Sequence, residues 1–340
     1  MQLKNEYLQV KEFGEPESVV ELQQQDIEVD QLGSDEMVIE MEYACIHPSD
    51  IYSIQGNYDN AKFNREHITP SRLGSEGIGK VIYAGKDAKY KKGEVILPML
   101  EPGIMGVWSK YVVAKDGLDL PKDFNLKMGA QLLVNPFTIL GMFTELEKNG
   151  PIKGKWLIIS AANSTLGRMS IRYAKKQGVQ VIGIVRKTDI VDSVKKEGCD
   201  KVLVQGKNDL VKEIMAITKN KGVEMALDAV GGELTQQLMN CMAIKGHLIQ
   251  FGILAGTSAT MDFTKLLFKM VEFQGFNLVV WLATEKSRLE TTKKRVIEEM
   301  ESKTFDSNVE AVYDIHDFKK AFHHQLHSET GRTGKLLFSF

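Results

Sequence analysis

One stretch of the chain decides the fold, the segment WLIISAANSTLG at residues 156–167. Its first four residues are a continuous apolar run, which is typical of a strand buried on both faces of a sheet. Small and polar residues follow. Apolar residues then recur on one helical face, at Leu166, Met169 and Tyr173, up to a stop near Gly178. The segment therefore predicts a buried strand, a tight turn and a helix.

The same alternation continues towards the C-terminus. Helical stretches separate further apolar runs, and a charged helical segment at about 284–302 comes last; the runs lie at 181–185, 201–204, 223–227, 247–251 and 276–280. Strands that alternate with helices of 10–15 residues are typical of a doubly wound parallel sheet. We therefore predict an α/β domain over residues 135–280.

The preceding part of the chain has a different pattern. Short strand-like runs at 37–41, 80–83 and 94–97 are punctuated by Gly and Pro, which indicates a β-barrel or sandwich. The tail at 335–338 again has the pattern of a strand, and we expect it to return to this domain. The first domain is therefore predicted to comprise residues 1–134 and 281–340.

Composition excludes several classes of protein. The chain has 340 residues, of which 43% are hydrophobic and 26% charged, with a formal net charge of −2. Three widely spaced cysteines do not make a disulfide scaffold, and no apolar run is long enough to span a membrane. The polar N-terminus lacks a secretory or transit pattern. We expect a cytoplasmic protein with no nucleic-acid or membrane partner.

The turn after the first strand of the α/β domain resembles a dinucleotide-binding loop. Aligned on G-x-G-x-x-G, Ala162 and Ser164 replace the first two glycines, and Gly167 keeps the third. Small residues still allow a pyrophosphate to approach the backbone and the positive end of the helix dipole. The alternative is an ordinary strand-to-helix turn whose Asn and Ser side chains cap the helix.

The residue that selects the cofactor is expected about 20 positions further on. Arg186 stands 19 positions beyond Gly167, at the end of the second strand, and Lys187 follows it. A guanidinium at this place can pair with a 2′-phosphate, whereas an acidic residue would bind the ribose hydroxyls of NAD. The sequence therefore favours NADPH over NADH. The alternative is a solvated basic pair beyond a strand end.

Metal-site spacing is absent from the sequence. There is no Cys-x-x-Cys and no H-E-x-x-H. His323 and His327 could share a helix face, but no acidic or sulfur partner has the spacing of a known site, so an exposed polar helix is the simpler interpretation. We predict no metal.

The order of the two domains resembles the medium-chain dehydrogenase/reductase superfamily over nearly the whole chain. In zinc-dependent members the segment 45–50 carries a ligand cysteine, where this chain has His47, and Ser75 replaces a ligand histidine. The four-cysteine structural lobe is also missing. The resemblance thus implies a zinc-independent member, with a GroES-like β-barrel domain joined to a Rossmann domain.

Within this superfamily the chain is similar to the trans-2-enoyl-thioester reductases. The similarity is carried by several spaced segments, which are 47–51, 54–58, 134–138, 162–164, 185–186 and 275–278 with Trp281. Two positions depart from the family pattern: His47 stands where Asn is usual, and Asp59 where Pro is usual. These departures concern the substrate more than the cofactor.

The resemblance implies a set of functional residues. Tyr58 would donate a proton to the substrate's α-carbon, or else pack over the cofactor without donating one. Trp108 would be a pocket aromatic, or else a structural one. Asn135 would orient the nicotinamide or its ribose, or else cap a helix. Further cofactor contacts are implied at Asn163, Ser164, Thr165, Leu166, Arg186, Lys187, Thr188, Gln250, Phe251, Gly252, Ile253, Phe276, Asn277, Leu278 and Lys335.

These observations lead to one function and two alternatives. We expect an NADPH-dependent reductase of activated C=C bonds, acting on small molecules such as 2-enoyl thioesters. The alternatives are an NADPH:quinone oxidoreductase and a non-catalytic, NADPH-binding regulatory protein. By resemblance we also expect a homodimer that pairs the strand at 276–280.

Overall fold

The computed structural model describes residues 1–57, 71–100, 106–121, 124–300, 302–327 and 334–340. The chain forms two compact units: the first contains residues 1–134 and 307–340, and the second residues 135–306. The first boundary lies where the sequence places it. The second lies at 306/307 rather than at 280/281, so residues 281–306 belong with the α/β unit.

Side-chain contacts explain why residues 281–306 stay with the second unit. Arg172 donates from Nε to the Thr304 carbonyl oxygen at 2.9 Å, and Lys176 pairs with Glu299 at 2.9 Å. Arg295 donates to the Tyr173 hydroxyl at 2.5 Å. A charged, amphipathic helix gives no sign in the sequence of which domain it will pack against.

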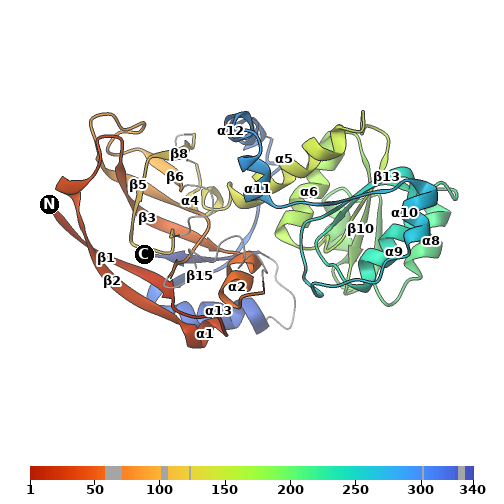
Figure 1. Cartoon of the computed structure of the whole chain (residues 1–340), viewed down its shortest axis with the longest axis horizontal. Helices are drawn as coiled ribbons and strands as arrows, with labels where there is room; N and C mark the ends of the chain where they lie inside the picture. The colour runs from red at the N-terminus through yellow and green to blue at the C-terminus, as the bar shows by residue number, and fades with distance from the viewer. Residues whose placement is uncertain (58–70, 101–105, 122–123, 301, 328–333) are drawn as a thin grey trace. The chain divides into compact units, whose positions relative to one another are not determined.

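The second unit is built on a six-stranded parallel sheet flanked by helices (Figure 1). Its strands are β9 (Trp156–Ile159), β10 (Gln180–Val185), β11 (Lys201–Val204), β12 (Val223–Asp228), β13 (Met242–Gln250) and β14 (Glu272–Gly275). The spatial order is β11-β10-β9-β12-β13-β14, and all pairs are parallel. Numbered within the unit this is 3-2-1-4-5-6, the order of a dinucleotide-binding fold.

The helices of this unit lie before, between and after its strands. They are α5 (Val134–Glu147), α6 (Thr165–Lys176), α7 (Val191–Lys196), α8 (Leu210–Ile217), α9 (Glu233–Cys241), α10 (Phe263–Lys269), α11 (Leu278–Ala283) and α12 (Ser287–Met300). Leu157, Ile158 and Ile159 of β9 are fully buried. Each such side chain contributes roughly 1.5–3 kcal/mol of transfer free energy. The apolar run at 156–159 therefore becomes the centre of the sheet.

The predicted strand at 276–280 is wrong. The strand is β14, which ends at Gly275, and α11 begins at Leu278. The Asn277 side chain accepts a hydrogen bond from the Val280 amide at 3.1 Å and caps the helix. A short apolar run fits a helix or a strand equally well, and here the cap decides.

The first unit is mostly antiparallel sheet. Its strands are β1 (Gln2–Val10), β2 (Val20–Glu28), β3 (Met37–Ile46), β4 (Ser71–Arg72), β5 (Gly77–Ala84), β6 (Val95–Met99), β7 (Tyr111–Ala114), β8 (Asp116–Asp119), β15 (Val309–Asp314) and β16 (Lys335–Ser339). Its helices are α1 (Pro16–Val19), α2 (Pro48–Ile54), α4 (Leu126–Gly129) and α13 (Phe318–His327), with short 3₁₀ turns at Val29–Gln31 and Ile315–Asp317.

The C-terminal strand is an inner strand of the larger sheet of the first unit. The order is β15-β16-β3-β5-β6-β8, with β7 also paired to β3, so β16 lies between β15 and β3. The prediction that the tail returns to the first domain is confirmed. Among the described residues, no helix is both long enough and apolar enough to cross a membrane.

Candidate functional site

The turn between β9 and α6 lies at the carboxyl edge of the parallel sheet. Ser164 is the N-cap of α6, and its hydroxyl oxygen accepts a hydrogen bond from the Gly167 amide at 3.0 Å. The first amides of a helix have no intrahelical partner and can donate to a phosphate. Ser164 therefore caps the helix, and the capped end remains suited to bind an anion.

The eroded glycine motif is compensated by neighbouring residues. Ala161 adopts a left-handed backbone with φ of 45°, which costs a non-glycine residue about 1 kcal/mol. The Ala162 amide donates to the Ile184 carbonyl oxygen at 3.0 Å and ties the turn to β10. A Cβ on Gly183 would lie only 3.0 Å from the Ala162 methyl, so glycine in β10 makes room for alanine in the turn.

The surviving glycine has a packing role. A Cβ on Gly167 would lie 2.7 Å from the Ala161 carbonyl oxygen, so helix and turn can approach only without one. Asn163 is held by Arg168, which donates from Nη2 to Asn163 Oδ1 at 2.6 Å. The two contacts fix the turn against the start of α6.

Arg186 follows the last residue of β10. Strands β9 and β10 are parallel neighbours, so both end at the same edge of the sheet. Arg186, Lys187 and Thr188 are exposed, and Arg186 makes no hydrogen bond or ion pair with any described residue. Its guanidinium is therefore available to an anionic ligand at this edge.

A buried polar network, which was not predicted from the sequence, lies between the carboxyl ends of β9 and β12. The strand order reverses direction at this point of the sheet. The Ser160 hydroxyl donates to Asp228 Oδ1 at 2.6 Å and accepts from the Ala229 amide at 2.8 Å. Thr235 donates to the other Asp228 oxygen at 2.7 Å. The signal in the sequence was a carboxylate directly after a buried strand, but its partner lies 68 residues away. The network fixes the carboxyl ends of both strands.

The predicted segment 250–253 joins the same edge. Gln250 ends β13, and its side-chain amide donates to the Gly252 carbonyl oxygen at 2.5 Å. A Cβ on Gly252 would lie 2.5 Å from the Ala229 carbonyl oxygen, so this residue must be glycine for the loop to lie against the end of β12. The Phe276 amide donates to the Gln250 carbonyl oxygen at 2.8 Å, which brings 276–278 beside this loop.

Asn135 begins the part of α5 that belongs to the second unit. Its side chain is 4% exposed, and its Nδ2 has no hydrogen-bond partner among the described residues. A buried amide without a partner is costly unless a ligand or water completes it. This favours the predicted ligand contact over helix capping. A Cβ on Gly141 would lie 2.5 Å from the Phe276 ring, so α5 packs closely on the predicted segment 276–278.

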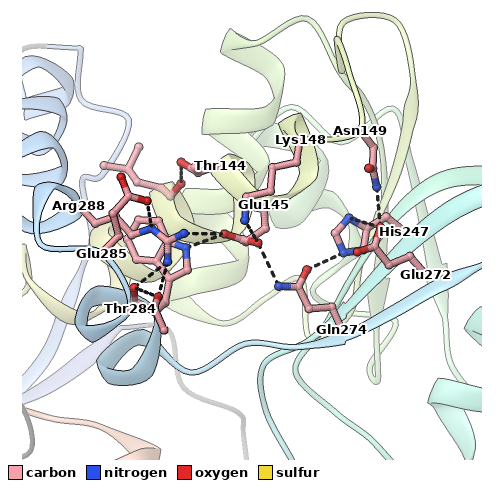
Figure 2. Close-up of polar contacts among 12 residues, drawn as sticks. Thr144, Glu145, Lys148, Asn149, His247, Glu272, Gln274, Thr284, Glu285 and Arg288 are labelled. Carbon is pink, nitrogen blue, oxygen red and sulfur yellow. Dashed lines mark hydrogen bonds and ion pairs between the residues drawn. The ribbon is translucent and has the colours of Figure 1, made fainter.

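Glu145 fixes α5 to β14 and α11 (Figure 2). Its carboxylate accepts from Trp281 Nε1 at 2.7 Å, Lys148 Nζ at 2.6 Å and Gln274 Nε2 at 3.1 Å. Burial opposes ionisation of Glu145, but these donors lower the pKa of its carboxyl group. Figure 2 shows the chain of contacts continuing from Gln274 to His247. The network holds the helix that carries Asn135.

A second cluster of charged side chains is buried in the first unit. His47 Nε2 lies 2.5 Å from Glu76 Oε1, and His47 Nδ1 lies 2.7 Å from Lys335 Nζ. The other Glu76 oxygen accepts from the amides of Leu133 and Val134, at 2.9 and 2.7 Å. Glu76 thereby links His47, the residue before α2, to the backbone at residues 133 and 134. Lys335 of β16 joins this cluster through His47.

The neighbours of His47 set its protonation. Burial and Lys335 lower the pKa of His47, but Cys45 and Glu76 outweigh them and raise it to about 9. Burial also opposes ionisation of Glu76, yet its contact with His47 lowers the Glu76 pKa. The Glu76 carboxylate thus favours the protonated form of His47.

Three further predicted site residues, Tyr58, Trp108 and Lys335, are not among those described above at the sheet edge. Tyr58 lies outside the described residues. Trp108 is fully buried, donates from Nε1 to the Cys45 carbonyl oxygen at 3.0 Å, and packs edge-on against Phe338. This arrangement corresponds to the structural alternative, because no face of the ring is open to a ligand. Lys335 lies in the first unit with its ammonium against His47, and its contact with a cofactor stays a prediction.

Comparison with known proteins identifies the family. Residues 33–122 match the model of an alcohol dehydrogenase GroES-like domain, and residues 165–292 match that of a zinc-binding dehydrogenase. The chain is 31% identical over 276 residues to the mitochondrial enoyl-acyl-carrier-protein reductase of Rattus norvegicus, covering 79% of this chain and 71% of that protein. The human enzyme of the same name is 30% identical over 275 residues, with the same coverage.

The chain belongs to the zinc-independent medium-chain dehydrogenase/reductases. Solved structures agree in fold. The complex of Etr1p with NADP and crotonyl-CoA matches with a TM-score of 0.84 at 21% identity, covering 99% of this chain and all of that one. A quinone oxidoreductase of Pseudomonas syringae matches with a TM-score of 0.83 at 22% identity, with the same coverage. As a member of this superfamily the protein is an oxidoreductase, which sets aside the non-catalytic alternative.

The buried cluster predicts a specific dependence of stability on pH. Because the pKa of His47 rises from 6.5 to about 9 on folding, its contribution is fully present below pH 6.5 and is lost as pH rises through 9. At about 1.4 kcal/mol per pKa unit, the contribution is at most about 3–4 kcal/mol. In urea unfolding, the free energy of unfolding of wild type should exceed that of His47→Asn at pH 6.5, and this difference should shrink as the pH rises to 9 and above.

The control is Asn5→Ala, which removes a buried side chain that does not titrate and that donates to Ser109 Oγ at 3.1 Å. Its difference from wild type should stay level over the same range. Parallel stability profiles for wild type and His47→Asn would show that the cluster does not bind its proton more tightly in the folded state.

Proposed function

We propose that this protein is an NADPH-dependent reductase of activated C=C bonds, most suited to trans-2-enoyl thioesters. The observation that carries the cofactor assignment is Arg186, which is exposed, has no partner among the described residues, and stands at the carboxyl end of β10 beside the β9–α6 turn. The substrate class is supported by the enoyl reductases among the relatives.

The described residues fit such a dinucleotide by chemistry. The N-terminus of α6 offers amides to a pyrophosphate, and Arg186 offers a planar pair of donors to a 2′-phosphate. The partnerless Nδ2 of Asn135 offers a donor to a carboxamide or ribose. When bound, NADPH supplies a hydride to the β-carbon of the substrate. Solved neighbours described with NADP and crotonyl-CoA are consistent with this chemistry.

The remaining chemistry falls to the chain. Negative charge develops on the thioester oxygen during hydride transfer, so hydrogen-bond donors fixed at that oxygen would lower the barrier. The α-carbon then takes a proton, for which we propose the Tyr58 hydroxyl. A phenol is protonated at neutral pH and can act as the acid.

Quinone reduction is the second candidate function. It is favoured by the likeness in fold to a quinone oxidoreductase and by His47, which stands where enoyl reductases usually have Asn. Both reactions would use the same nicotinamide cofactor. They differ in the acceptor, which must be an alkene conjugated to a carbonyl in one case and a quinone ring in the other.

We further propose that two copies of this chain associate through the β14 edge of the second unit. β14 is the last strand of its sheet and pairs only with β13 among the described strands. An unpaired edge can continue across a two-fold axis. Apolar side chains are exposed on β14 and the adjoining helices, at Phe263, Leu267, Phe268, Phe273 and Val280.

Light scattering tests this assembly. Wild type should have the mass of a dimer, and Phe268→Glu with Val280→Glu should have that of a monomer, because two charges would be buried at the interface. Val312→Glu changes an exposed valine on β15 and serves as control. A monomeric wild type, or dissociation by the control alone, would contradict the proposal.

The Arg186→Ala variant tests the cofactor assignment. Loss of one charge-assisted phosphate contact should weaken NADPH binding by roughly 1.5–3 kcal/mol and leave NADH binding nearly unchanged. Fluorescence titration with both cofactors measures the difference. Lys201→Ala is the control, because Lys201 is the first residue of β11 and does not lie at the carboxyl edge of the sheet. This substitution should change the affinity for neither cofactor. An equal loss for both cofactors in Arg186→Ala would contradict the assignment.

Steady-state assays decide between the two acceptors. With NADPH as the donor, crotonyl-CoA should be reduced with the higher kcat/KM, and a naphthoquinone with a lower one. Tyr58→Phe should slow crotonyl-CoA reduction while NADPH affinity persists. Turnover of the quinone alone would replace the leading proposal by the second candidate.

A further inference from the structure

Two helices of the first unit bring three metal-ligating side chains together. Helix α13 carries His323 and His327 four positions apart, which places both rings on one face of the helix. Helix α1 packs beside α13 and supplies Glu17, 306 residues earlier in the chain than His323. The sequence spacing therefore showed only two of the three groups.

The geometry of this cluster suits a small cation. His323 Nδ1 lies 3.2 Å from Glu17 Oε1, and the rings of His323 and His327 have their centroids 4.6 Å apart. One ligating atom from each of the three residues lies within 4.8 Å of the others. Ligands at about 2.0–2.2 Å from one metal stand some 3–3.5 Å apart, so small side-chain rotations bring the three atoms into range.

The cluster is accessible, and its side chains are free to make those rotations. The side chain of His323 is 66% exposed and that of Glu17 37% exposed. Two imidazoles and one carboxylate are the donors that Zn²⁺ and its first-row neighbours prefer, whereas Mg²⁺ and Ca²⁺ require oxygen ligands. The neighbouring His324 is engaged elsewhere, by Tyr313 and Glu310.

A second group of possible metal ligands, the buried Cys45, His47 and Glu76, is less suitable. Lys335 Nζ already contacts His47 Nδ1, and both oxygens of Glu76 are engaged. A dication there would be buried beside Lys335 and the protonated His47. Electrostatics therefore favours the exposed cluster.

We propose that Glu17, His323 and His327 form a binding site for a divalent transition metal such as Zn²⁺. The three side chains supply three ligands and leave a fourth position to water. Because Glu17 comes from α1 and the histidines from α13, the bound metal links the N-terminal segment of the first unit to its C-terminal helix. The site is separate from the proposed cofactor site in the second unit.

Isothermal titration of the untagged full-length protein with ZnCl₂ tests the proposal. Wild type should bind one Zn²⁺ per chain at this site with micromolar affinity. His323→Ala and His327→Ala should each weaken binding by about tenfold or more, since each removes a direct ligand, and Glu17→Gln should also weaken it. His316→Ala, an exposed histidine bonded to Asp314, is the matched control and should bind like wild type.

Thermal unfolding supplies a second measurement. Zn²⁺ in excess should raise the midpoint of wild type and of His316→Ala by a few degrees, because it binds the folded arrangement, and should leave His323→Ala unchanged. NADPH affinity should be the same in every variant, so a failure of the cofactor proposal would be seen separately.

Three results would overturn the metal site. One is wild-type binding too weak to detect at micromolar Zn²⁺. Another is equal binding by wild type, His323→Ala and His327→Ala. The third is binding that survives these substitutions but is lost in Cys45→Ser, which would place the metal at the buried cluster.

Discussion

The carboxyl ends of parallel strands must lie at one edge of their sheet, and the rest of the candidate site depends on this constraint. It places the β9–α6 turn, Arg186 and the loop after β13 along a single edge, although they are far apart in the sequence. The first amides of α6 and Arg186 therefore both lie at this edge. An anionic ligand bound there meets donors that the fold has already positioned.

Buried carboxylates fix the elements within each unit. Asp228 receives the Ser160 and Thr235 hydroxyls, and Glu145 receives a Trp, a Lys and a Gln side chain. Glu76 receives two backbone amides at the start of α5 and faces His47. An unpaired buried carboxylate would be destabilising by several kcal/mol, so each of these groups is held in one arrangement. Asn135 Nδ2, by contrast, is a buried donor that finds no partner among the residues that the structure describes.

Much of the α/β unit could be predicted from the sequence because its central strands, such as β9 and β10, are almost wholly buried. The apolar runs at 156–159 and 201–204 coincide with β9 and β11, and the tail at 335–338 lies within β16. The prediction failed where an apolar run is partly exposed: residues 278–283 form a helix because the Asn277 side chain caps it. Residues 281–306 belong to the second unit because they contact Arg172, Tyr173 and Lys176 of α6. No local sequence pattern reveals these long-range contacts.

The site was predictable in part, for a similar reason. The turn at 160–167 and Arg186 have signals in the local sequence. Pairs such as Ser160 with Asp228, or Glu17 with His323, are made by the folded chain alone. Trp108 shows the converse, since an aromatic residue beside a strand has the same local pattern whether it lines a pocket or fills a core.

The proposed use of NADPH depends on recognition of a 2′-phosphate at the end of β10. Calorimetric binding of 2′,5′-ADP and 5′-AMP to the wild-type protein tests it most directly, because the two nucleotides differ only in that phosphate. One charge-assisted contact worth roughly 1.5–3 kcal/mol predicts that 2′,5′-ADP binds at least about tenfold more tightly. Equal affinity for the two nucleotides would contradict the account.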